Sequence, residues 1–552
     1  MSPETRRIVL ATVLSVGVLM AWNVLFPTKR TPTPPAQPTT QSAPAPAPAP
    51  TQAPAGPAAG APSAPSAPPP VADAAEELVT LDGTGFDAVL TSHGGALKSL
   101  VLEGDKYKRE SKGGDVQPID LVRVAPGQAY PLSLLASPEL GGPQELAGAA
   151  EARAPMRIVS RDAKAVTFEG RAGQLAVRKT YRLTGKPFEL ELEVEVSGAQ
   201  GNGAVSILLP GYMPPDAPKG GLFSGPPLDF VRPVCRAGED TERLDLTSTK
   251  EPPQAPGAVA WAGIDQHYFV SAVLPKEPLG SCVFARGPGP GSGLAALRVP
   301  VEGGARTMSL TVYSGPKDLD LLRGYGRAFE TAIDYGAMAR PFAFFARVLL
   351  YVMRWLERIA RNWGVAIILL TLLVKALLLP LTYKSMQSMN EMRKLQPEIE
   401  KLKVKFGKDR EKLNVAQMEL FRQHKVNPLG GCLPMLLQLP IWFALYATLQ
   451  TSVELYRAPF LWNHDLTQHD RFFILPVAMG VSQFIMQKIS PQPADAAQAK
   501  MMLYFMPVMF SAMMLFLPSG LTLYIFVNNL LSIAQQQAML KLVPSPAPAK
   551  AK

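Results

Sequence analysis

Lys375 is the residue of this chain whose position most needs a chemical explanation. It lies inside the stretch ILLTLLVKALLLP, with apolar residues on both sides. An ammonium group in such a segment is costly inside a bilayer unless it faces water or a partner. Two interpretations are open: Lys375 snorkels toward nearby headgroups, or it is a cation lining a water-filled cavity between helices.

Other apolar segments carry polar residues that could share such a cavity. Thr371 precedes Lys375 by one helical turn, and the others are Gln438, Ser482, Gln483, Asn528, Asn529 and Ser532. Each alone is most often a hydrogen-bonding contact between helices. Because these segments contain no Asp or Glu, we expect a hydrated groove without a built-in counter-ion. Such a groove would attract acidic residues of a passing polypeptide, whereas a cation transporter more usually places a carboxylate at that depth.

Methionine is concentrated in the C-terminal part of the chain. Fourteen of the 21 methionines lie between residues 384 and 541. Met is flexible and polarizable, so a Met-lined face adapts to many partners, although gap filling explains each single Met equally well. We expect a partner-facing apolar surface at Met501, Met506, Met509 and Met513.

Motifs for catalysis or energy coupling are not found in the sequence. It has no GxxxxGK[ST], HExxH or GxSxG pattern, and its three cysteines and five histidines are scattered. We therefore expect a protein that is not an enzyme and has no cofactor and no metal site. A Ser/Lys peptidase, with Lys375 as the base for one of several serines, is an alternative that the sequence does not support by spacing.

The N-terminal part combines an apolar stretch with a proline-rich one. Residues 8–26 form a 19-residue uncharged stretch after Arg6 and Arg7, so we expect an uncleaved signal-anchor helix within 1–27. Residues 31–70 contain 15 prolines and 12 alanines without a charged residue. This composition predicts a semi-extended linker over 28–71.

Residues 72–335 have the composition of a folded domain outside the bilayer. In 188–196 (FELELEVEV) apolar residues alternate with Glu, and a hairpin loop joins this run to 177–183. Further strand-like runs lie at 204–209, 258–273 and 306–313. We expect an antiparallel all-β sandwich. Whether Cys235 and Cys282 pair in it is open.

A helical period begins after this domain. In 340–361, one face carries Arg347, Arg354, Arg358 and Arg361, and the other carries Phe345, Leu349, Val352, Leu356 and Ile359. This pattern predicts an amphipathic helix in the membrane interface, with a core helix of the sandwich domain as the alternative. The region 362–541 then contains apolar segments near 363–383, 433–451, 472–488, 501–518 and 520–540. With the N-terminal anchor they give six expected transmembrane helices, several of them short enough to thin the bilayer.

The connection 384–428 carries the largest charge excess. It has 11 Lys plus Arg against 6 acids, whereas 452–471 has two Arg against three acids. The positive-inside rule places 384–428 and the N-terminus in the cytoplasm, and therefore places the β domain outside. We expect a helical hairpin with a seam at Met392, Leu395 and Ile399. Its basic residues either serve topology alone or bind a partner, and they include Arg393, Lys394, Lys401, Lys403, Lys405, Lys408 and Arg410.

Several ordered sequence blocks resemble the YidC family of membrane protein insertases, the bacterial relatives of the mitochondrial Oxa and chloroplast Alb proteins. The matching blocks are DYG at 334–336, NWG at 362–364, MRKLQPEIEKLK at 392–403, NPLGGCLPMLLQLPIWFALY at 427–446, ILPVAMG at 474–480 and FLPSGLTLYIFVNNLLSIAQQQ at 516–537. Together they are distributed along nearly the whole of 334–541. The anchor, linker and β domain resemble the Gram-negative layout of the family in order and size.

The resemblance implies the fold and the activity. The fold would be a polytopic α-helical membrane protein with five helices in the insertase bundle, plus a periplasmic all-β super-sandwich domain. The activity would be insertion and folding of nascent membrane proteins in the bacterial inner membrane, alone or with the Sec translocon. The implied partners are the ribosome and a targeting receptor at the hairpin and at the tail 542–552, together with membrane lipids, and we expect a functional monomer.

The resemblance also implies roles for single residues. Lys375 falls at the position of the cavity cation, which is Arg in most members, so a bidentate pair with a client carboxylate is less expected here. Thr371 matches a polar groove position, and Tyr524 matches an aromatic residue that contacts clients. Many relatives have a second Tyr next, where this chain has Ile525. The alternative function is a small-solute or ion transporter with an extracytoplasmic sensor domain, which usually shows paired hydrophobic halves that this sequence lacks.

Overall fold

The computed structural model describes most of the chain from residue 75 to residue 542. The described residues are 75–110, 116–137, 151–198, 203–214, 230–248, 250–287, 289–301, 304–336, 342–406, 409–424, 426, 433–490 and 500–542. The predicted anchor at 1–27, the linker at 28–71 and nearly all of the tail at 542–552 lie outside them.

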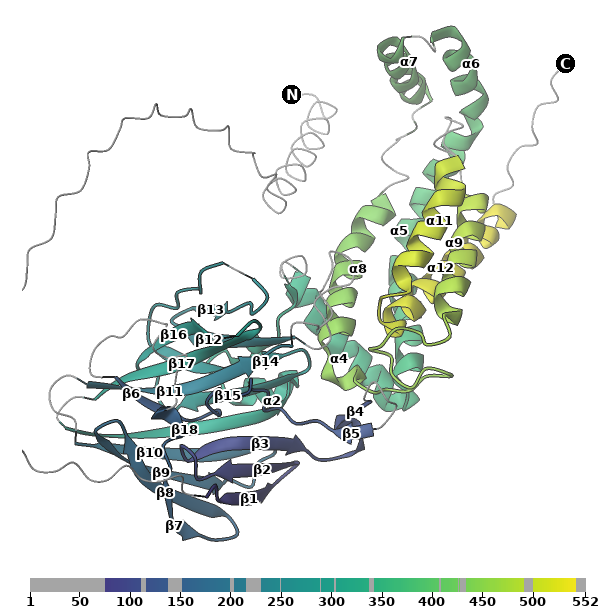
Figure 1. Cartoon of the computed structure of the whole chain (residues 1–552). Helices are drawn as coiled ribbons and strands as arrows, with labels where there is room; N and C mark the ends of the chain where they lie inside the picture. Colours follow the sequence, from purple (N-terminus) through teal and green to yellow (C-terminus); the bar gives the residue numbers. More distant parts are fainter. Residues whose placement is uncertain are drawn as a thin grey trace, which may run out of the picture. The chain divides into compact units, whose positions relative to one another are not determined.

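The part between residues 78 and 316 is built from antiparallel strands (Figure 1). A nine-stranded sheet has the order β13 (Asp240–Arg243), β12 (Val231–Ala237), β14 (Val259–Gln266), β15 (Phe269–Pro275), β18 (Ala305–Pro316), β10 (Glu189–Ser197), β9 (Leu175–Leu183), β8 (Ala165–Ala172) and β7 (Arg157–Arg161). A four-stranded sheet has the order β16 (Ser281–Arg286), β17 (Ser292–Val301), β11 (Gly203–Tyr212) and β6 (Leu134–Ser137). Smaller sheets are formed by β1 (Leu78–Gly83), β2 (Phe86–Thr91) and β3 (Ala96–Leu102), and by β4 (Lys108–Glu110) with β5 (Val116–Pro118). Short 3-10 turns are η1 (Asp105–Tyr107), η3 (Glu151–Arg153) and η4 (Phe329–Ala332).

The predicted hairpin and sandwich are confirmed. Strand β10 pairs with β9, with Leu190 opposite Leu183, and it pairs on its other side with β18. Its apolar residues Leu192, Val194 and Val196 are buried in a core that the sheets share, as the alternation with Glu requires. Cys235 on β12 and Cys282 on β16 form a disulfide between the two large sheets.

The single run expected at 258–273 is wrong in one respect. It forms two strands, β14 and β15, which pair with each other as a hairpin in which Asp265 faces Val270. The turn at His267 and Tyr268 contains neither Gly nor Pro, so the sequence gives no break signal there.

The C-terminal part of the chain is helical. Its elements are α2 (Leu319–Gly324), α4 (Ala343–Ala360), α5 (Trp363–Lys394), α6 (Gln396–Phe406), α7 (Arg410–Gln423), α8 (Leu433–Thr451), η7 (Val453–Leu455), α9 (Ile474–Ile489), the π-helical turn η8 (Met501–Phe505), α11 (Met506–Met514) and α12 (Ser519–Leu542). Helix α12 packs against both α5 and α9 (Figure 1). Among the described residues, one helical segment, Trp363–Ser385, is long and apolar enough to cross a membrane by length and composition.

Helix α5 differs from the expected apolar segment that ends at 383. It continues without interruption to Lys394, because the residues after Pro380 include no further Gly or Pro until Pro397. The next helix starts at Gln396 with Pro397 in its first turn, where a missing N–H is tolerated. The predicted hairpin is therefore carried on an extension of the same helix that holds Lys375.

Helix α4 forms where expected, but its buried face is different. Its buried side chains are Ala346, Leu350, Met353 and Leu356, whereas Phe345 and Ile359 of the predicted apolar face are exposed. Small residues determine which face of α4 is buried, because Ala346 packs against Ala444 and Ala447 of α8. Several large side chains of α4 remain exposed as a consequence, namely Phe344, Phe345, Val348, Tyr351, Trp355 and Ile359.

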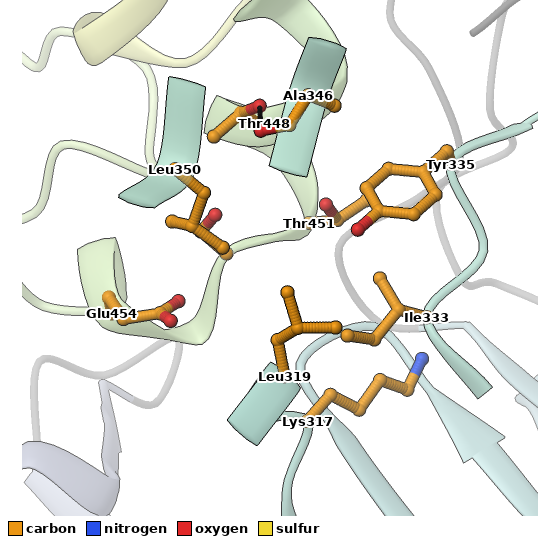
Figure 2. Close-up of a pocket in the computed structure, with 10 residues that line it drawn as sticks. Lys317, Leu319, Ile333, Tyr335, Ala346, Leu350, Thr448, Thr451 and Glu454 are labelled. Atoms are coloured by element: carbon orange, nitrogen blue, oxygen red, sulfur yellow. Dashed lines mark hydrogen bonds between the residues drawn. The ribbon is translucent and has the colours of Figure 1, made fainter. Parts of the chain in front are cut away.

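Arg354 of α4 is not on a solvated face as the arginine spacing predicts. Its guanidinium donates to Glu454 in η7 and to Asp318 and Asp320 at the start of α2. Next to this network lies a small cavity of about 10 Å³, and Figure 2 shows Glu454, Thr451 and Tyr335 among the residues around it. The network ties α4, the end of α8 and the segment that follows the last strand.

Candidate functional site

Lys375 of α5 is held by the last helix. Its Nζ donates a hydrogen bond of 2.7 Å to Oγ of Ser532 on α12. The Ser532 hydroxyl in turn donates to the backbone oxygen of Asn528 at 2.8 Å. Because its single proton is used there, the Ser532 oxygen can only accept from Lys375.

Helix α8 joins the same group of residues. Nε2 of Gln438 donates to Oδ1 of Asn528 at 2.9 Å. Lys375, Ser532, Asn528 and Gln438 therefore form one connected set, which we call the lysine cluster, with members on α5, α8 and α12. All four side chains are half-buried.

Ser482 and Gln483 belong to a separate group on the other side of α12. Nδ2 of Asn529 donates to Oγ of Ser482 at 3.2 Å and to Oε1 of Gln483 at 3.0 Å. Successive residues of a helix point about 100° apart, so Asn528 and Asn529 serve different neighbours. The polar residues that we expected to line one hydrated groove thus form two clusters that share α12.

Thr371 and Tyr524 are buried residues and not open polar groups of a groove, and Tyr524 lies next to Gln438 of the lysine cluster. The Thr371 hydroxyl donates to the backbone oxygen of Ile367, one turn earlier in its own helix, at 2.7 Å. Both side chains are almost fully buried. A client can reach either side chain only after the helices separate.

The four methionines of the predicted apolar surface lie on η8 and α11. Met501 and Met509 are exposed, and Met506 and Met513 are half-buried. Tyr504, Phe505 and Val508 are exposed beside them, so this face is apolar over its whole described length.

The lysine cluster has one cation and no acidic partner among the described residues. None of the ion pairs found in that part of the chain includes Lys375. The ammonium is satisfied by a neutral hydroxyl, which is a weaker acceptor than a carboxylate. The site can therefore exchange Ser532 for an anionic group at a gain in electrostatic energy.

The basic hairpin is formed by α6 and α7, which pack through a small core of Leu395, Ile399 and Val426 with Met392 and Leu420 beside it. Lys394, Lys401 and Lys405 are exposed, and Lys403 is half-buried. Lys408 and the side chains of Arg393 and Arg410 lie outside the described residues. The hairpin therefore presents several lysines to solvent beyond the end of the apolar part of α5.

Sequence reasoning missed the two ionic networks outside the bundle. One is Arg354 with its three carboxylates, and the other surrounds Asp265, which accepts from Lys317, Arg232 and Arg243. The sequence offered one hint of the Arg354 network, because Glu454 is the only acidic residue in the first half of the connection 452–471. For the second, the partners are separated by up to 52 residues and no local pattern joins them.

Two family models together match most of the chain. Residues 78–352 match the YidC periplasmic domain, and residues 355–545 match the 60Kd inner membrane protein.

Curated relatives match over the full length. The chain is 68% identical over 553 residues to the membrane protein insertase YidC of Anaeromyxobacter sp. (strain K), covering 100% of both chains. It is 37% identical to the YidC insertase of Citrifermentans bemidjiense, covering 98% of this chain and 99% of the relative. A solved structure of an active YidC insertase matches 83% of this chain and 91% of that chain, with 21% identity and a TM-score of 0.35.

Full-length identity and both family models agree with the β-sandwich and helical regions of the structure. The chain therefore belongs to the YidC family of membrane protein insertases, as an inner membrane member with a periplasmic domain and with nascent membrane proteins as clients.

Proposed function

We propose that the lysine cluster is the place where this insertase receives the polar segment of a client. The observation that carries the proposal is the hydrogen bond from Lys375 to the neutral Ser532 in a site without a described carboxylate. A client Asp or Glu is a stronger acceptor for an ammonium than a hydroxyl is. The client carboxylate would take the place of Ser532 and leave when its segment moves on.

The apolar part of the client follows a different route. It passes along the exposed face of η8 and α11, which includes Met501 and Met509, and enters lipid. Transfer of its own apolar surface from water supplies the driving force, so no nucleotide is needed at this protein. Separation of α5, α8 and α12 would open the hydrated groove toward the cytoplasm and make Thr371 and Tyr524 accessible.

The proposed topology has six transmembrane helices with the N-terminus in the cytoplasm. The supports are the excess of basic residues in 384–428 and the position of the α6–α7 hairpin beyond α5. The domains would be those expected from the sequence: an anchor at 1–27, a linker at 28–71, a periplasmic β domain at 72–335, an interfacial helix at 340–361 and an insertase core at 362–541. The protein would act as a monomer, alone or with the Sec translocon.

The test is insertion of a small single-span client with one acidic residue into proteoliposomes that contain only this protein. Wild type should insert the client without nucleotide, Lys375→Ala should fail, and Lys375→Arg should retain most activity because the charge stays. Lys488→Ala, which removes a lysine from α9, is the matched control and should insert normally.

Normal insertion by Lys375→Ala would mean that Lys375 has no part in receiving this client. A client whose acid is replaced by the neutral amide separates the roles further. Its insertion should depend much less on Lys375 if the carboxylate is what the ammonium binds.

A further inference from the structure

Large apolar side chains crowd the end of the helical bundle that lies opposite the hairpin. Leu461 is 72% exposed, Phe472 61% and Phe516 75%, and Phe473 and Ile474 are also exposed. We call these five residues the outer collar. They come from the connection between α8 and α9, from the first residue of α9 and from the turn between α11 and α12.

Hydrogen bonds hold these two segments together. The backbone N–H of Ser519 donates to the oxygen of Gln468 at 2.7 Å, and that of Gly520 donates to the oxygen of Leu466 at 2.9 Å. The turn that carries Phe516 is thus fixed on the α8–α9 connection. Asn362, just before α5, donates to the oxygen of Pro459, so the first turn of α5 lies at the same end.

Several backbone polar groups of the α8–α9 connection form hydrogen bonds within the connection itself. Phe460 and Asn463 exchange two backbone hydrogen bonds of 2.8 and 3.0 Å. Asp470 is buried and accepts from the backbone of Phe472 and Leu475 and from Nε1 of Trp462. Non-helical backbone occurs at membrane depth only where protein shields it from lipid, and these hydrogen bonds turn the polar groups of the connection inward.

The helices below the collar are short. Helix α9 has 16 residues and the apolar run Met501–Met514 has 14. At about 1.5 Å per residue these helices measure roughly 24 and 21 Å, against a hydrocarbon core of about 30 Å. An apolar collar at their outer ends extends the apolar height of the bundle by the missing part.

The collar is continuous with the lipid-facing stripe of α9. Ile474, Val477, Val481 and Ile485 are all exposed, and their spacing of 3, 4 and 4 puts them on one face of the helix. The stripe runs on past the start of the helix into Phe473 and Phe472, and it ends at the exposed Arg471.

We propose that the outer collar is immersed in the outer leaflet of the inner membrane, among acyl chains just below the headgroups. The α8–α9 connection is then a membrane-embedded anchor that fixes the depth of the short helices. This inference rests on the proposed crossing of the bilayer by α5.

The test measures how deeply the collar lies in the bilayer. In the full-length protein with Cys432→Ser, a single cysteine is introduced in turn as Leu461→Cys, Phe472→Cys or Phe516→Cys. Each cysteine is labelled with bimane after reconstitution into vesicles. Fluorescence is then compared in lipids brominated near the top of the acyl chain and in buffer with iodide.

Two exposed positions supply the controls. Leu377→Cys on α5 reports lipid, and Val159→Cys on β7 reports water. The proposal expects the collar probes to lose fluorescence in brominated lipid as strongly as the Leu377 probe. It also expects iodide to quench them much less than it quenches the Val159 probe.

Three outcomes would overturn the proposal. Quenching of the collar probes by iodide alone would place the collar in water, and protection from both quenchers would mean that a second protein copy covers it. If the Leu377 probe is also insensitive to brominated lipid, the proposed crossing by α5 fails together with the collar. If brominated lipid quenches the Leu377 probe but not the collar probes, the collar inference fails while the proposed crossing by α5 stands.

Discussion

Asp265 is a fully buried carboxylate on β14 that balances three cations. It is hydrogen-bonded to Lys317, to Arg232 at 3.0 Å and to Arg243 at 3.0 Å. Burial by itself would raise the pKa of Asp265, but the charges of these three neighbours outweigh it and hold the pKa below the ordinary value of 3.8. The folded state therefore contains the ionised form and depends on it.

Asp265→Asn should destabilise the β domain strongly, because it leaves the buried Lys317 and Arg243 without their carboxylate and leaves Arg232 with Asp334 alone. We expect a loss of about 3–5 kcal/mol at pH 7. The folded pKa is depressed, so the wild-type contribution is present above about pH 4 and is lost as the pH falls through the folded pKa. Denaturant unfolding of the full chain between pH 3 and 7 should show a flatter acid limb for the variant.

Asp240→Asn is the control, since Asp240 is an exposed acid in the same sheet. It should leave both the stability and its pH dependence unchanged. An equal loss in the two variants would show that the ion cluster around Asp265 contributes nothing specific.

The burial of strand residues was predictable from the sequence only where apolar and polar residues alternate. On β9, Val177, Lys179 and Tyr181 share the buried face, and Lys179 is completely buried although its type argues for solvent. Its ammonium donates to the backbone oxygens of Gly94 and Gly95, which lie 85 and 84 residues away. Such partners cannot be found from local sequence, because only the folded sheet brings them together.

At the scale of the element, helix periodicity predicted the existence and length of α4 but not which stripe is buried. Two apolar stripes were available, and contact with the small residues of α8 selected the one with Ala346. Arg354 was left facing three carboxylates from α2 and η7. Several of the polar residues singled out on the bundle helices hydrogen-bond between helices, but their division between two sides of α12 required the helix positions.

Arg354→Gln should loosen the attachment of η7 and the end of α8 to α4, because three carboxylates then lie together without their cation. We expect a local loss of about 2–4 kcal/mol. Hydrogen–deuterium exchange should increase in 450–458 and in 318–324, while α5 and α12 keep their protection. Arg358→Gln, one turn later and exposed, removes the same charge and should change neither segment.

Unchanged exchange in Arg354→Gln would show that packing around Ala346 and Leu350 holds the junction by itself. An increase that also reaches α5 and α12 would instead indicate that the whole bundle unfolds.

At the scale of the whole molecule, composition alone separated the β domain from the helical region. Both are confirmed, and the two family models divide the chain between residues 352 and 355. The number of transmembrane helices is harder to predict than the division into these two regions. Short segments such as α9 fail a length criterion that suits longer helices. The resemblance of ordered blocks carried the functional prediction, because neither net charge nor hydropathy identifies a client.

The charge of the hairpin provides a prediction about partners. The triple variant Lys401→Gln, Lys403→Gln and Lys405→Gln should weaken binding to ribosomes, because cationic side chains that neutralise RNA phosphates release counterions. Co-sedimentation of the protein in detergent with ribosomes should show weaker binding and a shallower dependence on salt.

The matched variant carries Lys98→Gln, Lys186→Gln and Lys276→Gln in the β domain, so the net charge of the two proteins is the same. It should bind ribosomes like wild type. Equal weakening in both variants would reduce the effect to overall charge, and no weakening in either would exclude these lysines from the contact.

The unbroken course of α5 has a mechanical consequence. One helix of 32 residues carries Lys375 and leads directly into the hairpin. It is about 48 Å long, with Pro380 inside it, and Lys375 and Lys394 are separated by roughly 28 Å. A tilt of about 10° around Lys375 would swing the Lys394 end by about 5 Å. Under the proposed function, a heavy partner bound to the hairpin would therefore apply torque to the helix that holds the Lys375 ammonium, and docking would be coupled to opening of the lysine cluster.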